Sequence, residues 1–186
     1  MNLPNKLTAL RIILTPFFLA SMLIEFPFHY TIAAFIFIVA SVSDLIDGKI
    51  AREKNMITTF GKLCDPLADK LLITAALLAF MKLGICNIWI IMAILAREFL
   101  VTSFRVVASS QGVVIAAGFL GKLKTVSQMF FTSVILFAIQ IFEHYSFDFK
   151  ILSVISNVFL GISAILTVVS GLKYIIDGVK VVDISI

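Results

Sequence analysis

Residues 44–70 read DLIDGKIAREKNMITTFGKLCDPLADK. This stretch lies between two apolar runs and carries four aspartates: Asp44, Asp47, Asp65 and Asp69. The members of each pair are three or four residues apart, a spacing that puts both side chains on one face of an α-helix. Because the first pair ends one apolar run and the second pair begins the next, the two pairs are expected to converge at one end of a helical hairpin.

The rest of the chain has the composition of a membrane protein. Of its 186 residues, 61% are hydrophobic and 14% are charged, whereas soluble domains are closer to half apolar and a quarter charged. The mean hydropathy is +1.11. We therefore expect one membrane domain, residues 1–186, whose surroundings are the lipid bilayer, and we expect no nucleic-acid partner.

The apolar runs predict an all-α, polytopic fold with six transmembrane helices. A spanning helix needs roughly 20 apolar residues, and the candidate spans are roughly 7–24, 30–53, 62–81, 86–106, 123–142 and 150–174. Short connections at 25–27, 82–84 and 143–145 join them in pairs. No small-residue cleavage site follows the first run, so we expect it to be retained as a span.

The distribution of basic residues predicts the orientation. Of the 15 Lys and Arg residues, only Lys82 and Lys150 fall on the side of the three short connections. The positive-inside rule then places the other side, with both termini and the aspartates, in the cytoplasm. The protein is thus expected in the cytoplasmic (inner) membrane, with its active site facing the cytoplasm.

This orientation also makes predictions for the cysteines and histidines. Cys64 and Cys86 would lie near opposite faces of the membrane, too far apart for a disulfide. His29 and His144 fall in the outer turns, where we expect them to be solvated.

Four converging carboxylates repel one another unless something neutralises them, and within a membrane they would otherwise protonate. Divalent cations solve this problem, and oxygen-only ligands select hard ions such as Mg²⁺, Mn²⁺ or Ca²⁺. Paired metals recur in displacements at phosphorus, where they stabilise the entering and leaving oxygens. The alternative is that the aspartates are helix-end charges that pair with neighbouring Lys and Arg; the regular spacing of all four favours a metal site.

Small residues accompany the aspartates. Gly48 costs roughly 1 kcal/mol against Ala inside a helix, a cost that a ligand approaching the backbone would justify, although close helix packing would justify it equally. Ala51 leaves room on the same helix, and Gly61 either leaves room or makes a turn. Pro66 fits the first turn of the third helix or a kink within that helix.

The residues described so far resemble the CDP-alcohol phosphatidyltransferase family. The chain matches its signature without departure, in the pattern Asp44-x₂-Asp47-Gly48-x₂-Ala51-Arg52-x₈-Gly61-x₃-Asp65-x₃-Asp69. Further resemblance, to the branch that uses glycerol 3-phosphate, lies in the stretches 4–11, 65–70, 96–105 and 121–125. A small departure is Ser103, where relatives often have Gly.

The resemblance implies a six-helix membrane homodimer that transfers a phosphatidyl group from CDP-diacylglycerol to sn-glycerol 3-phosphate and releases CMP. Two divalent ions, Mg²⁺ or Mn²⁺, would hold the donor diphosphate. By position, Asp44, Asp47 and Asp65 would be metal ligands, and Asp69 would be the catalytic base and a further metal ligand. The residues implied in binding CDP are Asp44, Gly48, Ala51, Arg52 and Gly61.

An acceptor that carries a phosphate needs cations around it, and Arg suits bidentate phosphate contacts. The candidate residues for this phosphate share the cytoplasmic side: Thr8, Arg11, Arg97, Arg105, Lys122 and Lys124. For the two lysines the alternative is attraction to lipid headgroups. For Arg97 the alternative is an ion pair with Glu98.

Two alternative functions remain. A sister enzyme would use inositol phosphate, serine or phosphatidylglycerol as acceptor, and the basic residues argue against the last two. A divalent-cation transporter would also need intramembrane acids, but the outer halves of the spans carry no matching set.

Overall fold

The computed structural model describes residues 3–53, 59–113 and 118–180, with side chains described at all of these except 3–4, 44–53, 59–63, 65–66 and 69. The described residues fold into six α-helices, which confirms the predicted all-α class. The helices are α1 (Leu3–Leu23), α2 (His29–Glu53), α3 (Thr59–Lys82), α4 (Ile88–Ser110), α5 (Phe119–His144) and α6 (Phe149–Val179).

Each helix coincides with one predicted span. Among the described residues, three segments are long and apolar enough to cross a membrane: Asn5–Leu23 in α1, and the whole of α5 and α6. The 19 residues of the first correspond to a length of about 28 Å, close to the thickness of the hydrocarbon core. The apolar part of α2 is shorter, His29–Ser43, so crossing by the remaining helices and the orientation stay predictions.

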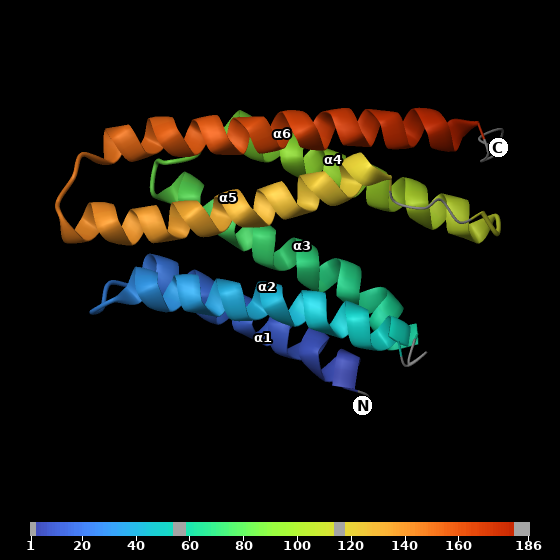
Figure 1. Ribbon diagram of the computed structural model, residues 1–186, viewed down its shortest axis with the longest axis horizontal. Helices are drawn as coiled ribbons and strands as arrows, with labels where there is room; N and C mark the ends of the chain where they lie inside the picture. The colour runs from blue at the N-terminus through green and yellow to red at the C-terminus, as the bar shows by residue number, and fades with distance from the viewer. Residues whose placement is uncertain (1–2, 54–58, 114–117, 181–186) are drawn as a thin grey trace.

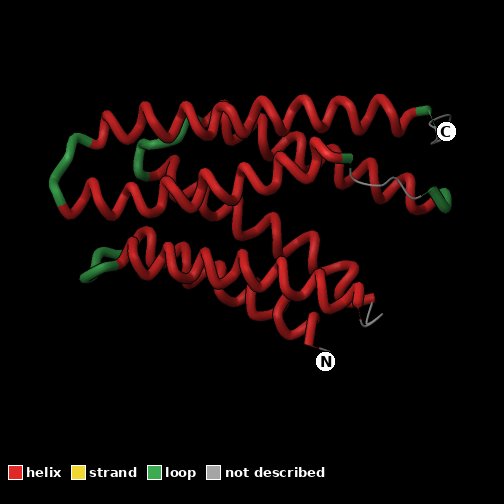
Figure 2. Tube along the Cα trace, viewed as in Figure 1, coloured by secondary structure: helices red, strands yellow, loops and turns green. Residues whose placement is uncertain are grey.

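All the short turns lie at one end of the helical bundle (Figures 1 and 2). The α1–α2, α3–α4 and α5–α6 turns gather at this turn end, together with Lys82 and Lys150. The first residues of α1 and α3, and the last residues of α2, α4 and α6, lie toward the opposite end, which we call the terminus end (Figure 1). Successive helices run in opposite directions, because each connection reverses the chain. The first, third and fifth helices therefore all end at the turn end.

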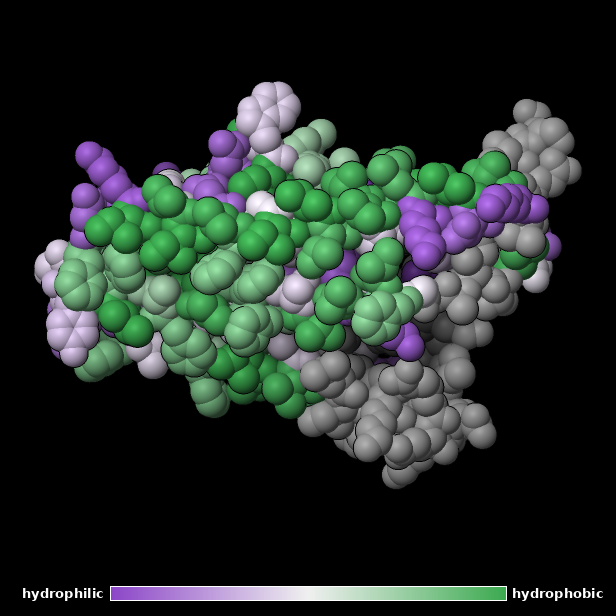
Figure 3. Space-filling model, turned by 45° about the horizontal axis from the view of Figure 1, so that its top comes forward, coloured by the Kyte–Doolittle hydropathy of each residue, from purple (hydrophilic) through white to green (hydrophobic). Residues whose placement is uncertain are grey.

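The helices pack as two groups of three. α1 lies against α2 and α3, while α6 lies against α4 and α5. Contacts of α2 with α5, and of α3 with α4, join the groups (Figure 1). Apolar residues cover most of the face shown in Figure 3, and hydrophilic residues gather mainly toward its two ends. This distribution suits a bundle surrounded by lipid.

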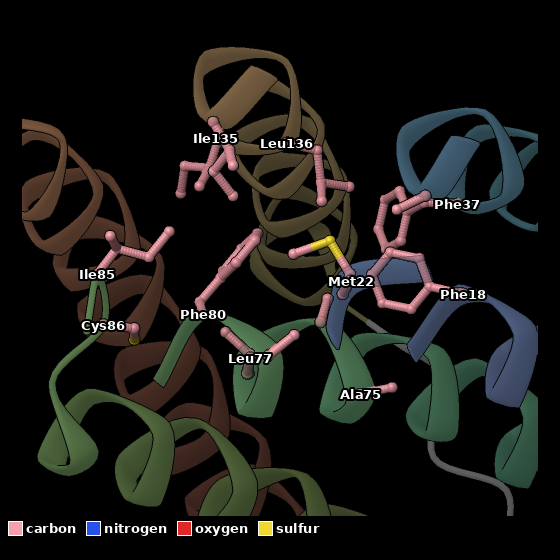
Figure 4. Packing of buried hydrophobic residues seen from close by; sticks show 14 of the residues in the cluster. Phe18, Met22, Phe37, Ala75, Leu77, Phe80, Ile85, Cys86, Ile135 and Leu136 are labelled. Carbon is pink, nitrogen blue, oxygen red and sulfur yellow. The ribbon is translucent and has the colours of Figure 1, made fainter. Parts of the chain in front are cut away.

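The interior changes character along the bundle, beginning with an apolar core toward the turn end. Phe18 and Phe37 are fully buried, and their ring centroids are 5.8 Å apart. Phe80 of α3 and Leu136 of α5 point toward the same core (Figure 4). These side chains fill the space between the two groups of helices.

Toward the terminus end the buried side chains are polar. Four of the five buried polar residues described in α1 come before its core residues Phe18 and Met22, and the fifth, Ser21, lies between those two; the four are Asn5, Thr8, Arg11 and Thr15. Lys124, Gln128 and Thr132 are buried in the first part of α5, and Ser163, Thr167 and Ser170 in the later part of α6. A polar interior at this depth needs a function, because burying polar groups is costly.

The structure settles three smaller expectations. Cys64 and Cys86 are both free, as predicted. Pro66 lies inside α3 and not in its first turn, because the helix already begins at Thr59. The expectation that His29 is solvated is wrong: it is 5% exposed, because its ring packs against Tyr30 with centroids 3.9 Å apart.

Candidate functional site

The predicted metal site begins with the backbone positions of the four aspartates. Asp44 and Asp47 lie in the second half of α2, and Asp65 and Asp69 in the first half of α3. The two helices contact each other. The helical conformation required by the spacing argument is therefore present on both sides, while the side chains of these aspartates lie outside the described part of the chain.

The residues predicted to bind CDP are placed in the same way. Gly48, Ala51 and Arg52 follow Asp47 within α2, and Gly61 is the third residue of α3. All of them belong to helices and none to the connection between them. Their side chains also fall outside the described residues, so their contact with a nucleotide stays a prediction.

A charged cluster of three side chains lies between α4 and α5. Arg97 Nη1 donates a hydrogen bond to Glu98 Oε1 at 3.0 Å. Lys124 Nζ donates to the same oxygen from α5. The three side chains, Arg97, Glu98 and Lys124, are only 13%, 16% and 8% exposed. The structure thus brings together two predicted phosphate-binding cations and confirms the ion pair of Arg97 with Glu98.

Helix α6 completes the surroundings of Arg97. Arg97 Nη2 donates a hydrogen bond to Ser170 Oγ at 3.0 Å. The next residue, Gly171, leaves the space that the arginine stem occupies: a Cβ atom built there would lie 2.5 Å from Arg97 Cγ. Arg97 Nε is buried and has no hydrogen-bond partner among the described residues. The guanidinium is therefore held at two of its five N–H groups.

A small pocket, partly open to solvent, lies beside this cluster between α3, α4 and α5; we call it the cavity. Its polar lining comprises Lys70, Thr74, Glu98, Lys124, Thr125 and Gln128. Its apolar walls include Ile73, Leu95 and Phe99. Arg97 and Lys124 share the single carboxylate of Glu98, so the cluster beside the cavity carries one net positive charge and favours an anion.

Gln128 adds a neutral donor to the cavity. It is one helical turn after Lys124 and only 2% exposed. Its Nε2 has no hydrogen-bond partner among the described residues. Because an unsatisfied buried donor is costly, this amide suits a ligand or water inside the cavity.

The other predicted phosphate-binding residues lie in different surroundings. Thr8 and Arg11 are almost completely buried within α1. Arg105 lies two turns beyond Arg97, with its guanidinium carbon 5.7 Å from the ring centroid of Tyr174. Lys122 is exposed on α5. Of the six predicted phosphate-binding residues, only Lys124 belongs to the described lining of the cavity, and Arg97 lies beside it through Glu98. Contact of the other five with a ligand stays a prediction.

Comparison with known proteins decides the family. Residues 1–169 match the family described as CDP-alcohol phosphatidyltransferase. The chain belongs to the CDP-alcohol phosphatidyltransferase family. The match includes the whole of α1–α5 and much of α6, and therefore both the aspartates and the charged cluster.

Curated relatives cover nearly the whole chain. A Bacillus subtilis protein named CDP-diacylglycerol--glycerol-3-phosphate 3-phosphatidyltransferase is 40% identical over 185 residues, with 93% of each chain covered. A Rickettsia bellii protein of the same name is 35% identical over 173 residues, again with 93% of each covered. A Mycobacterium tuberculosis protein named probable phosphatidylglycerophosphate synthase is 36% identical over 177 residues, covering 94% of this chain and 80% of that protein.

For this family member, sequence reasoning missed part of the site. Glu98 was expected only as a partner of Arg97, yet it also binds Lys124. Gln128 could have been found from its position four residues after Lys124, on the same helix face. The contact between Arg97 and Ser170 joins residues 73 apart in sequence, and a Ser-Gly pair in an apolar helix is a weak signal by itself.

Proposed function

We propose that this protein transfers the phosphatidyl group of CDP-diacylglycerol to sn-glycerol 3-phosphate, forming phosphatidylglycerophosphate and releasing CMP. The names of its relatives support the reaction. The cavity with Lys70, Glu98, Lys124 and Gln128 supports an acceptor that carries a phosphate. This cationic cavity is the observation that favours glycerol 3-phosphate over serine or an uncharged alcohol.

The donor half of the reaction rests on the signature in α2 and α3. Its donor set consists of carboxylate oxygens from Asp44, Asp47, Asp65 and Asp69, which fits hard divalent ions. Two ions, Mg²⁺ or Mn²⁺, would neutralise charge on the donor diphosphate and on the departing CMP. Gly48, Ala51, Arg52 and Gly61 would contact the CDP group, with Asp44 shared between the metal and CDP.

The acceptor half rests on the charged cluster and the cavity. The phosphate of glycerol 3-phosphate would bind among Arg97, Lys124 and the further candidates Thr8, Arg11, Arg105 and Lys122. Glu98 does not repel this phosphate strongly, because Arg97 and Lys124 already share its charge. The apolar walls Ile73 and Phe99 lower the local dielectric constant, which strengthens the attraction between the phosphate and the cations.

Proton transfer falls to Asp69. Its carboxylate accepts the proton of the acceptor hydroxyl while that oxygen attacks the phosphorus attached to diacylglycerol. A new oxygen–phosphorus bond forms there, and the bond from this phosphorus to the oxygen of CMP breaks. The helical position of Asp69, one turn after Asp65 in α3, supports a base next to the metal ligands.

The membrane setting belongs to the same proposal. All six helices cross the cytoplasmic membrane, and the terminus end faces the cytoplasm, where glycerol 3-phosphate is dissolved. The polar interior at the terminus end and the position of Lys82 and Lys150 at the turn end support this orientation. The protein acts as a homodimer, an expectation that rests on the family resemblance.

The test follows CMP release from purified protein in detergent with CDP-diacylglycerol, adding one candidate acceptor at a time. We expect release only with glycerol 3-phosphate, and only when Mg²⁺ or Mn²⁺ is present and EDTA is absent. Release with inositol phosphate in its place would overturn the proposed acceptor. Absence of release with any acceptor, from folded protein, would contradict the whole proposal and favour cation transport.

A variant of Asp69 tests the proposed base. Asp69→Asn should lower CMP release by about 10²- to 10⁴-fold, the usual contribution of general base catalysis, while CDP-diacylglycerol still binds. Asp177→Asn is the matched control, because its side chain is 57% exposed near the end of α6. Full activity in Asp69→Asn would show that another group accepts the proton.

A further inference from the structure

The side chain of Arg97 is held from two directions. Glu98, its neighbour in α4, accepts a hydrogen bond from Nη1, and Ser170 in α6 accepts one from Nη2, both at 3.0 Å. Two contacts at the far ends of a planar guanidinium fix its orientation. Three N–H groups, including the buried Nε, remain for other acceptors.

The hydroxyl of Ser170 is itself oriented. Its hydrogen is donated to the backbone carbonyl of Thr167, at 3.0 Å. The oxygen lone pairs are therefore left to accept from Arg97, and the hydroxyl cannot turn to offer its hydrogen without breaking this bond. Ser170 is 4% exposed, so water does not easily replace it as an acceptor.

Gly171 has no side chain, and this lets the aliphatic part of Arg97 pack directly against the backbone of α6. An added Cβ would lie 2.5 Å from Arg97 Cγ, 2.9 Å from Nε and 3.2 Å from Cδ. Any side chain at this position would therefore push Arg97 away from Ser170. Gly161, ten residues earlier in α6, has nothing within 4 Å of such a Cβ, so of these two glycines only Gly171 contacts Arg97.

We propose that Ser170 and Gly171 are positioning residues, which hold Arg97 in the orientation that binds the phosphate of the acceptor. This inference rests on the proposed function and extends it to α6. The acceptor affinity of the enzyme then depends on a helix that carries none of the signature aspartates.

The first test measures KM for both substrates in Ser170→Ala and Gly171→Ala. Each variant should raise KM for glycerol 3-phosphate about tenfold or more, the effect of losing one hydrogen bond to a charged group. KM for CDP-diacylglycerol should stay within about twofold of the wild-type value.

Ser163→Ala and Gly161→Ala are the controls. Ser163 is fully buried on the same helix, and its Oγ has no hydrogen-bond partner among the described residues. An unchanged acceptor KM in Ser170→Ala, or equal increases for both substrates, would overturn the proposal.

A double-mutant cycle separates positioning from a general effect on stability. In an Arg97→Lys background a single ammonium cannot donate to Glu98 and Ser170 in the same planar arrangement. Adding Ser170→Ala should then change the acceptor KM by less than about twofold. An undiminished tenfold effect in this background would show that Ser170 does not act through Arg97.

A binding readout keeps this test independent of the reaction. Inorganic phosphate should raise the thermal unfolding temperature of the detergent-solubilised wild type more than that of Ser170→Ala. If the wild type releases no CMP with glycerol 3-phosphate but still shows this difference, the proposed reaction is wrong and the positioning role stands. Equal phosphate shifts in the two proteins would overturn the positioning role.

Discussion

At the scale of single residues, Glu98 organises the charges of the cluster. One of its carboxylate oxygens accepts hydrogen bonds from both Arg97 and Lys124. Removal of one partner from a buried ion pair leaves the other charges uncompensated, which costs more than the pair itself contributes. Glu98 thus allows two cations to remain close together before any anionic substrate arrives.

Glu98→Gln should therefore destabilise the protein by about 3 kcal/mol, because two buried cations would face each other without a counter-charge. Inorganic phosphate should restore part of the loss by binding to these cations. Thermal unfolding with and without phosphate measures both effects.

Glu25→Gln is the matched control, since Glu25 is exposed in the turn between α1 and α2. It should change the unfolding temperature little and respond to phosphate as the wild type does. A Glu98→Gln protein that is as stable as the wild type, with no added response to phosphate, would contradict the compensating role.

At the scale of helices, contacts near the turn end join α2 to α1 and α5. His29 Nδ1 donates to the carbonyl of Ser21 at 3.0 Å, and Nε2 lies 3.4 Å from Glu143 Oε1. Nearby, Thr31 donates from both its backbone N–H and its hydroxyl to Gln140 Oε1, at 3.0 and 2.7 Å. The contacts of His29 with Glu143 and of Thr31 with Gln140 connect the two groups of three helices far from the charged cluster.

His29→Ala should lower the stability by about 1–2 kcal/mol, the value of the lost hydrogen bonds and ring packing, without changing the acceptor KM. Thermal unfolding and steady-state kinetics measure the two quantities. His144→Ala, at an exposed position in the same end of the bundle, should be neutral. A changed acceptor KM in His29→Ala would mean that this contact is coupled to the distant site.

Helix-scale features were largely predictable from sequence, and contacts between helices were not. Continuous apolar runs and turn residues place all six helices, because every backbone polar group in a lipid-surrounded segment must be satisfied within the helix. The burial of His29 depends on Tyr30 and on Ser21 in a different helix. Hydropathy along the chain carries no information about such neighbours.

The candidate site divides in the same way. The spacing of Asp44, Asp47, Asp65 and Asp69 is a local pattern, and it led directly to the family that the comparison shows. The position of the Arg97 side chain depends on Ser170 and Gly171, which come from the mainly apolar helix α6. A serine and a glycine in such a helix do not indicate a contact with Arg97 in the sequence. The contact follows from the packing of α6 against α4.

At the scale of the whole molecule, the orientation in the membrane can be tested with single cysteines. In a background with Cys64 and Cys86 replaced, we would introduce His144→Cys at the turn end and Ser110→Cys at the terminus end. A membrane-impermeant maleimide added to right-side-out vesicles should label the first, and should label the second only after the vesicles are opened.

Both positions are exposed in the folded protein, so a difference in labelling reports the side of the membrane and not burial. CMP release by each variant serves as the control for correct folding. Labelling of Ser110→Cys in intact vesicles would reverse the orientation proposed for the whole bundle.

The division of the interior into a polar part and an apolar part has a consequence for the cell. Polar side chains such as Lys124 and Gln128 lie in the interior nearer the terminus end, whereas Phe18, Phe37 and Phe80 fill the interior toward the turn end. In a membrane, a hydrated passage through the full depth would leak protons and dissipate the ion gradient. For a bundle that spans the membrane as proposed, the aromatic core would therefore also act as a barrier to ions.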